Sequence, residues 1–296
     1  MAGVDKLRVL VLGRRGQLGS ELERLLTGRV ALTAWGRDEL DLSQLEFIWP
    51  AVKRVRPELV INCAGYTNVD RAEDEPEKAM LLNGRVPEEL ARACAGIGAK
   101  LAHISTDYVF DGETDRAYRE MDAPNPLQVY GTSKLAGEQA VFSASGGAVV
   151  LRTSWLYHMG YPSFPRRVLG WARGQKRIRI VAEHVSSPTW ATRLALILAE
   201  SIQNGELLER QGLYHVAGAG QCSRYDWAKT TLQLDPRGDE HTHEAVEAVV
   251  AEAFGGARRP RFSALDCSKF DADFGLNRPN WKEDLLTALQ GEWAVS

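Results

Sequence analysis

The chain has 296 residues, of which 44% are hydrophobic and 25% are charged, and its formal net charge is −3. This size and apolar content predict one large globular domain or two of ordinary size, and the weakly negative charge argues against binding to nucleic acid or to an anionic membrane surface. The longest continuously apolar stretch, 194–199, is too short to span a bilayer. The N-terminal LRVLVLG is short and contains Arg8, unlike a secretory signal, so we expect a cytoplasmic protein.

The first half of the chain alternates short apolar runs with helix-like segments. We expect strands at 7–13, 31–35, 58–64, 100–105 and 147–154. Helices are expected between them at 16–26, 45–55, 77–96 and 131–141; the third is either one long helix or a broken pair, and Pro87 disfavours the unbroken form. This alternation is typical of right-handed crossovers, which predicts an α/β fold with a Rossmann-type, doubly wound parallel sheet.

The alternation loosens after Ser154. Helices are expected at 164–174, 192–203, 243–254 and 281–289, and strands at 177–183 and 212–218. The change predicts a dinucleotide-binding Rossmann domain over 1–154 and a smaller, mainly substrate-binding lobe over 155–296, with some segments free to return to the first domain. A cleft between two such lobes is the expected ligand site.

The cysteines and histidines predict neither disulfides nor a metal site. Cys63, Cys94, Cys222 and Cys267 lie far apart without paired spacing, which is typical of reduced thiols in the cytoplasm. The HTH stretch at 241–243 has no cysteine nearby, and zinc needs three or four convergent ligands. We therefore interpret it as a loop and expect no bound metal.

The loop after the first expected strand carries Gly13, Gly16 and Gly19 in a G-x-x-G-x-x-G pattern. Glycines at such positions allow a tight turn, close approach of the backbone to a pyrophosphate, and close packing of helix on sheet. The amides at the N-terminus of the following helix favour an anion. The pattern therefore predicts the pyrophosphate site of a dinucleotide, with a purely structural turn as the alternative.

The charges near this loop bear on which dinucleotide binds. An acidic residue ending the second strand would hold the ribose hydroxyls of NAD, but the first polar residue there is Arg37. The guanidinium groups of Arg15 and Arg37 match a 2′-phosphate, so we expect NADPH to be preferred. NADH stays open because Asp38 and Glu39 follow directly, and both arginines could instead be solvated loop residues.

Tyr130 and Lys134 lie one turn apart, on one face of the helix expected in VYGTSKLAGE. A nearby ammonium lowers the pKa of a tyrosine, so the pair can protonate a carbonyl oxygen as hydride arrives. Ser105 and Thr106 end the fourth strand, at the edge of a parallel sheet where ligands bind. A hydroxyl there can share the charge that develops on a substrate oxygen; we favour Thr106, the alternative being that either hydroxyl caps the strand end.

These motifs resemble those of extended short-chain dehydrogenases/reductases and, more closely, of the dTDP-4-dehydrorhamnose reductase family. The resemblance covers nearly the whole chain. It rests on the stretches GQLG, VINCAGYTNVDRAEDEP, STDYVFDG, NPLQVYGTSKLAGE, LRTSWLY, SSPTWATRLA, GLYHVAG and RPRFSALD…FGLNRPNW. Two stretches depart from the family pattern: AEHVSSPT lacks the usual acidic residue and glutamine, and Ser163 replaces an asparagine before a phenylalanine. They lie in the expected substrate lobe and leave the exact sugar open.

The resemblance implies hydride transfer from NADPH or NADH to the C4 keto group of dTDP-4-dehydro-L-rhamnose, giving dTDP-L-rhamnose. It implies a catalytic triad of Thr106, Tyr130 and Lys134, in which Tyr130 is the acid and Lys134 tunes it and holds the nicotinamide ribose. The implied cofactor contacts are Gly13, Arg15, Gly16, Gln17, Leu18, Gly19, Arg37, Asp41, Leu42, Cys63, Ala64, Gly65, Tyr66, Asn83, Tyr130 and Lys134. The implied substrate contacts are Val69, Thr106, Tyr108, Tyr130 and Trp155.

Two alternative functions stay open. One is a 4-ketoreductase for a different nucleotide-activated deoxysugar of secondary metabolism. The other, which the complete Thr–Tyr–Lys set argues against, is a non-catalytic regulatory subunit of methionine adenosyltransferase. The expected partner is a small nucleotide-sugar substrate, without nucleic acid or membrane. A homodimer stays open; some relatives dimerise through a metal bound by glutamates, which have no match in this sequence.

Overall fold

The computed structural model describes residues 6–275 and 278–293. Residues 1–5 of the first expected lobe and 294–296 of the second lie outside these ranges, as do residues 276–277 of the FGLNRPNW stretch. A six-stranded parallel sheet with the order β10-β5-β4-β3-β1-β2 organises the fold. Its strands are β1 (Arg8–Leu12), β2 (Ala31–Trp35), β3 (Leu59–Asn62), β4 (Lys100–Thr106), β5 (Val149–Thr153) and β10 (Gly212–His215). The chain reverses direction across the sheet at β1, so β1 and β3 form a topological switch point where ligands bind.

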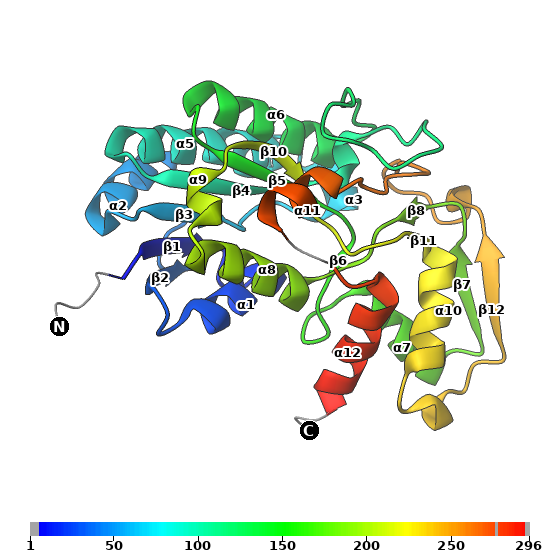
Figure 1. Cartoon of the computed structure of the whole chain (residues 1–296). Helices are drawn as coiled ribbons and strands as arrows, with labels where there is room; N and C mark the ends of the chain where they lie inside the picture. Colours follow the sequence, from blue (N-terminus) through cyan, green and yellow to red (C-terminus); the bar gives the residue numbers. More distant parts are fainter. Residues whose placement is uncertain (1–5, 276–277, 294–296) are drawn as a thin grey trace.

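Helices cover both faces of this sheet (Figure 1). One face packs against α2 (Ile48–Val55), which follows the 3-10 turn Leu45–Phe47, and against α5 (Val86–Ile97) and α6 (Val129–Ala144). The other face packs against α1 (Gln17–Leu26), α8 (Ala191–Gln203), α9 (Glu206–Glu209) and α11 (Ser268–Phe274). Neighbouring residues of β1 contribute to different cores, Val9 and Val11 to one and Leu10 and Leu12 to the other, because successive side chains of a strand point to opposite faces. The predicted α/β Rossmann-type architecture is confirmed.

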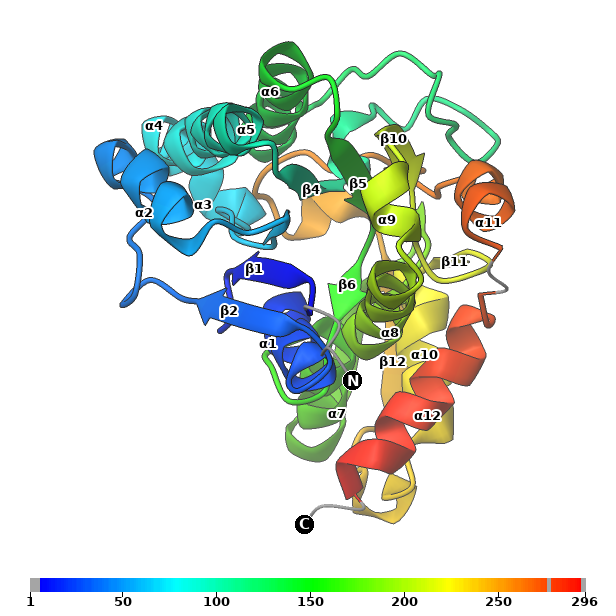
Figure 2. The same ribbon diagram turned by 60° about the vertical axis from the view of Figure 1, so that its left-hand side comes forward.

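The second expected lobe contains most of the remaining elements, visible at the lower side of Figure 2. Its helices are α7 (Phe164–Gly174), α10 (Arg224–Leu234) and α12 (Trp281–Trp293). Three two-stranded pairs accompany them: β7 (Arg177–Val181) with β12 (Ala245–Val249), β6 (Leu156–Tyr157) with β9 (Thr189–Trp190), and β8 (Val185–Ser186) with β11 (Cys222–Ser223). Since β10 and α8 belong to the sheet and its cover although they follow residue 154, the two-lobe division stays a proposal.

One predicted helix, 243–254, is wrong. The structure has the strand β12 there, paired in parallel with β7, followed by a short 3-10 turn at Ala251–Ala253. The pairing with β7 satisfies the backbone hydrogen bonds of a segment rich in valine, whose branched side chains favour strands. The helix α10 (Arg224–Leu234) was not predicted from the sequence.

The helical path through 77–96 continues past Pro87, which the sequence disfavoured. It runs from α4 (Pro76–Met80) through a π-helical turn, Leu81–Arg85, into α5. The Val86 amide donates to the carbonyl of Leu81, five residues earlier, and Pro87 stands in the first turn of α5. A proline is tolerated there because its missing N–H needs no helical partner.

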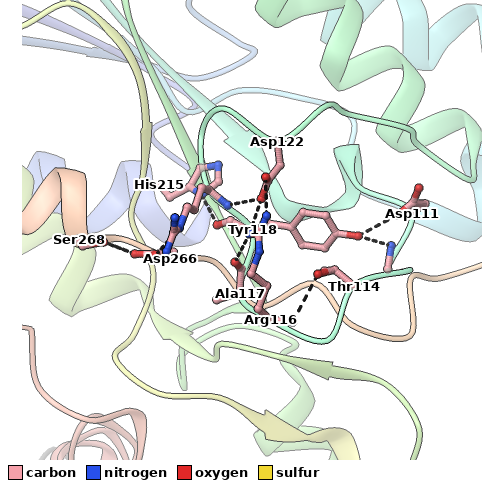
Figure 3. A network of polar contacts seen from close by, with 11 residues as sticks. Asp111, Thr114, Arg116, Ala117, Tyr118, Asp122, His215, Asp266 and Ser268 are labelled. Carbon is pink, nitrogen blue, oxygen red and sulfur yellow. Dashed lines mark hydrogen bonds and ion pairs between the residues drawn. The ribbon is translucent and has the colours of Figure 1, made fainter.

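A polar network holds the long loop between β4 and α6 against the C-terminal part of the chain (Figure 3). The Tyr118 hydroxyl donates to Asp111 at 2.7 Å and accepts from the Gly112 amide at 2.9 Å. The Tyr118 carbonyl lies 2.9 Å from the His215 ring in β10, and Arg119 pairs with Asp266 at 3.3 Å. This loop follows Thr106 and precedes Tyr130, so the network helps to fix their relative positions. No helix within the described ranges combines the length and apolar character needed to cross a membrane.

Candidate active site

A cavity of about 910 Å³ lies along the carboxyl ends of strands β1 to β5. Its walls include Gly13 after β1, Gly36 after β2, Cys63 after β3, Thr106 at the end of β4 and Ser154 after β5. The parallel arrangement of the strands brings these ends to the same edge of the sheet. Tyr161, Pro162 and Arg224 close the cavity from the later part of the chain.

The glycine turn forms one end of this cavity. Gly13 has φ +86°, and a Cβ atom there would lie 2.9 Å from the Ala64 amide nitrogen. Gly19 does not line the cavity; a Cβ atom there would lie 2.2 Å from the Gly13 carbonyl oxygen, so Gly19 permits the close packing of α1 on the turn. Gly16 caps α1 without a side-chain hydrogen bond, which leaves backbone amides at the helix N-terminus for an anion. These features fit the pyrophosphate of a dinucleotide.

Acidic side chains accompany each arginine of this region. Arg15 forms an ion pair with Asp38, and Arg37 pairs with Asp41 at 3.2 Å. Both arginines line the cavity while their side chains stay 67% and 77% exposed. Arg14 points elsewhere: it pairs with two glutamates at 3.3 Å and does not line the cavity. Of the three arginines near the glycine turn, Arg15 and Arg37 therefore contribute positive charge to the cavity and Arg14 does not.

Asn83 fixes the segment that follows β3. Its side chain accepts from the Tyr66 amide at 2.8 Å and donates to the Tyr66 carbonyl at 2.9 Å and to the Ser133 hydroxyl at 3.0 Å. Tyr66 itself does not line the cavity, and its hydroxyl donates to Glu75. The Asn83 bonds hold the backbone of 63–66 against α6, the helix that carries Tyr130.

Thr106, Tyr130 and Lys134 all line the cavity. Burial raises the pKa of Tyr130 above its usual value, and a hydrogen bond with Thr106 opposes this shift. Lys134 donates to the Ile104 carbonyl at 2.6 Å, and its burial lowers the pKa of its ammonium to about 8. The expectation that Lys134 lowers the pKa of Tyr130 is therefore not met, because burial dominates and the ammonium binds the backbone of β4. A tyrosine that keeps its proton suits the role of an acid.

The two hydroxyls that end β4 have different surroundings. Ser105 donates to Glu138, which forms a buried ion pair with Arg152 at 2.6 Å. Thr106 donates to Asp107 at 3.1 Å and accepts from the Tyr108 amide at 3.2 Å. Both hydroxyls are therefore held by a buried carboxylate. Thr106 also hydrogen-bonds with Tyr130, which favours Thr106 as the hydroxyl beside the expected acid.

Asp107 was not predicted from the sequence, although it lies within STDYVF. Burial raises the pKa of its carboxyl to about 6, against hydrogen bonds that lower it. Those bonds come from Ser186 at 3.1 Å, Ser263 at 2.5 Å and Thr106. Asp107 thus joins the hydroxyl of Thr106 to two segments of the second expected lobe.

Aromatic residues surround the opposite end of the cavity. Trp155 is only 8% exposed and has φ +40°, a strained value for a bulky residue of the kind that clusters at functional sites. Its ring stacks on Trp227 with centroids 5.5 Å apart, and the guanidinium of Arg224 lies 3.8 Å from its centroid. Trp227 and Arg224 therefore both pack against the ring of Trp155, one of the substrate contacts that the resemblance implies. Sequence reasoning missed Arg224 and Trp227, because no motif marks them.

The structure brings nearly all of the expected site residues to this one cavity. The exceptions are Gly19 and Tyr66. The residues expected to contact cofactor or substrate that line it are Gly13, Arg15, Gly16, Gln17, Leu18, Arg37, Asp41, Leu42, Cys63, Ala64, Gly65, Val69, Asn83, Thr106, Tyr108, Tyr130, Lys134 and Trp155. Their individual roles stay proposals.

Comparison with known proteins agrees with this geometry. The family model described as "RmlD substrate binding domain" matches residues 7–292. The dTDP-4-dehydrorhamnose reductase of Sinorhizobium fredii is 34% identical to this chain and aligns over 98% of each chain. The enzyme of the same name from Streptomyces griseus is 37% identical over 92% of this chain and 90% of its own.

Solved structures show the same arrangement. A crystal structure of a dTDP-4-dehydrorhamnose reductase from Clostridium acetobutylicum superimposes with a TM-score of 0.89 at 30% identity, over 97% of this chain and 100% of the other. The Bacillus anthracis enzyme, solved in complex with NADP, gives 0.88 at 31% identity, over 98% and 100%. By the family model, the sequence relatives and the fold together, this chain belongs to the dTDP-4-dehydrorhamnose reductase family.

Proposed function

We propose that this enzyme reduces the C4 keto group of dTDP-4-dehydro-L-rhamnose to give dTDP-L-rhamnose, with NADPH as the preferred hydride donor and NADH as the alternative. The observation that carries the proposal is the single cavity lined by both the glycine turn and the residues Thr106, Tyr130 and Lys134. The names of the relatives and the NADP complex of the Bacillus anthracis enzyme support the substrate and the cofactor.

The roles of the residues follow from their surroundings. A nicotinamide dinucleotide held at the glycine turn would supply the hydride that C4 accepts. Tyr130 donates its proton to the C4 oxygen, so the C=O bond becomes C–OH and the phenolate is later reprotonated from water. Thr106 hydrogen-bonds with Tyr130 and orients its hydroxyl. Lys134, whose ammonium is charged below about pH 8, would hold the nicotinamide ribose. Asp107 and Tyr108 hold Thr106 in place.

A Tyr130→Phe variant tests the acid role. We expect cofactor oxidation with dTDP-4-dehydrorhamnose to fall roughly 10²–10⁴-fold, as for loss of a general acid, with the Kd for NADPH unchanged. Tyr225→Phe is the matched control, because the Tyr225 hydroxyl donates to the Val246 carbonyl and the residue does not line the cavity. If Tyr130→Phe keeps wild-type turnover, Tyr130 is not the acid.

A second candidate substrate is another dTDP-linked 4-keto deoxysugar. The departure AEHVSSPT favours it, because Ser186 within this stretch donates to Asp107 beside the cavity. Reduction of a panel of keto sugars, with product stereochemistry determined by NMR, separates the two candidates. Turnover of another sugar without turnover of dTDP-4-dehydrorhamnose would replace the first candidate by the second.

The cellular location and the assembly are also proposals. We propose that the enzyme works in the cytoplasm, in keeping with its four free cysteines. A homodimer stays open and is tested by the molar mass in solution.

A further inference from the structure

Arg224 differs from the other arginines of the cavity. It begins α10, is partly buried and lines the cavity beside Trp155. Its guanidinium lies 3.8 Å from the Trp155 centroid, 4.8 Å from that of Phe164 and 5.2 Å from that of Trp227. Within residues 6–275 and 278–293, no carboxylate lies within ion-pair distance of it, whereas Arg15 and Arg37 each have one.

In this environment, aromatic rings and not a carboxylate surround the positive charge of Arg224. Removing a guanidinium from water is unfavourable unless an anion or hydrogen bonds replace the water, and aromatic rings compensate only part of the loss. Burial accordingly lowers the pKa of Arg224. The carboxylate of Asp107, which attracts Arg224, is already hydrogen-bonded to Ser186 and Ser263. Arg224 is therefore free to bind an anion that enters the cavity.

Tyr108 relates Arg224 to the expected catalytic tyrosine. The rings of Tyr108 and Tyr130 meet edge to face with centroids 6.1 Å apart, and the hydroxyl of Tyr108 hydrogen-bonds with Arg224. Arg259 also reaches Tyr108, but Asp70 neutralises it through contacts of 2.6 and 2.7 Å. Of the two arginines beside Tyr108, Arg224 is thus the one without a carboxylate partner. The side chain of Tyr108 lies between Arg224 and Tyr130.

The shape of a nucleotide sugar fits this separation. In a pyranose, C1 lies across the ring from C4, so a sugar with its C4 oxygen at Tyr130 directs its diphosphate away from Tyr130. A guanidinium matches phosphate oxygens in geometry and charge. We propose that Arg224 binds the diphosphate of the nucleotide sugar and thereby selects nucleoside-diphosphate-activated sugars over sugars without a diphosphate. This inference rests on the proposed function, because that function places C4 at Tyr130.

Binding measurements with dTDP and with thymidine as probes test this role apart from turnover. The wild-type protein should bind dTDP more tightly than thymidine. In Arg224→Met, we expect the affinity for dTDP to fall roughly 10- to 100-fold, in line with loss of hydrogen bonds to a charged group. The affinities for thymidine and NADPH should stay unchanged, and Arg224→Lys should retain part of the affinity for dTDP.

Arg179→Met is the matched control. Arg179 is exposed, lies 5.6 Å from the Phe254 centroid and does not line the cavity, so its loss should leave the affinity for dTDP unchanged. Near-UV circular dichroism checks that the aromatic cluster stays folded. If Arg224→Met is misfolded, Arg224→Gln decides, because it removes the charge and keeps a polar side chain: an unchanged affinity for dTDP with an unchanged salt dependence would overturn the inference.

Two results have distinct meanings for the inference and for the proposed function. An unchanged ratio of dTDP to thymidine affinity in folded Arg224→Met overturns the inference and leaves Arg224 as an aromatic stacking residue. If the wild-type protein reduces no dTDP-linked sugar, yet binds UDP, ADP or dTDP in an Arg224-dependent manner, the proposed function fails while the diphosphate role stands.

Discussion

The double variant Arg15→Ala/Arg37→Ala should shift cofactor use from NADPH toward NADH. Hydrogen bonds to charged groups contribute about 1.5–3 kcal/mol, and solvent screening of side chains that are 67% and 77% exposed favours the low end. Their present partners, Asp38 and Asp41, compete weakly, because exposed ion pairs contribute about 0–1 kcal/mol. We therefore expect kcat/KM for NADPH to fall roughly 10- to 100-fold and kcat/KM for NADH to change little.

The assay is the initial rate of oxidation of each cofactor at saturating nucleotide sugar, as a function of ionic strength. Arg14→Ala is the control, because Arg14 belongs to the same turn but pairs with Glu23 and Glu39 away from the cavity. Asp38→Asn should raise the preference for NADPH by releasing Arg15. If the double variant keeps the wild-type ratio of the two kcat/KM values, the arginines do not contact a 2′-phosphate.

Three further predictions concern the triad and its support. Burial lowers the pKa of Lys134 to about 8; since the ammonium is charged only below its pKa, kcat/KM for reduction should fall as the pH rises through about 8. Glu138→Gln leaves Arg152 buried without its counter-charge, which should lower the free energy of unfolding in urea by about 3–5 kcal/mol. Gly19→Ala forces a Cβ against the Gly13 carbonyl and should destabilise the turn by about 1–3 kcal/mol, seen as a lower Tm and a higher Kd for NADPH.

Each of these predictions has an outcome that contradicts it. A kcat/KM that is constant from about pH 7 to about pH 10 would mean that the charge of Lys134 is not needed. Glu88→Gln, which removes a surface pair with Arg92, should change stability by less than about 1 kcal/mol; an equal loss in Glu138→Gln would mean that its burial is unimportant. Gly170→Ala in α7 meets open space, and it should not weaken NADPH binding as Gly19→Ala does.

Most of the Rossmann sheet could be predicted from the sequence, because each buried parallel strand is a short apolar run ending at a turn residue. The prediction of a helix over 243–254 was wrong for a physical reason. Its pattern of alanine, valine and glutamate suits either a helix or a strand, and only the neighbouring β7, distant along the chain, decides between them. The helix likewise continues past Pro87 because of a π-helical turn, and no residue pattern predicts such a turn.

The site could be predicted where a local motif carries the chemistry. The glycine turn, Thr106 and the Tyr130–Lys134 pair all line one cavity, although their roles are still to be tested. The pKa of Tyr130 could not be predicted, because it depends on how deeply the ring is buried and on where Lys134 points. Arg224 was missed because its significance arises from three aromatic rings brought to it by tertiary folding.

The return of late segments to the Rossmann sheet bears on the order in which the protein can fold during synthesis. Leu22 and Leu26 of α1 share one core with Leu198 of α8, Tyr214 of β10 and Phe274 of α11. A nascent chain that ends soon after β5 therefore holds a glycine turn and five strands, but only α1 covers this face of its sheet and the edge of β5 is unpaired. Such edges and apolar faces invite association with other chains. The core on the α1 face of the nucleotide half is therefore complete only after α11, near the end of the chain, has been synthesised.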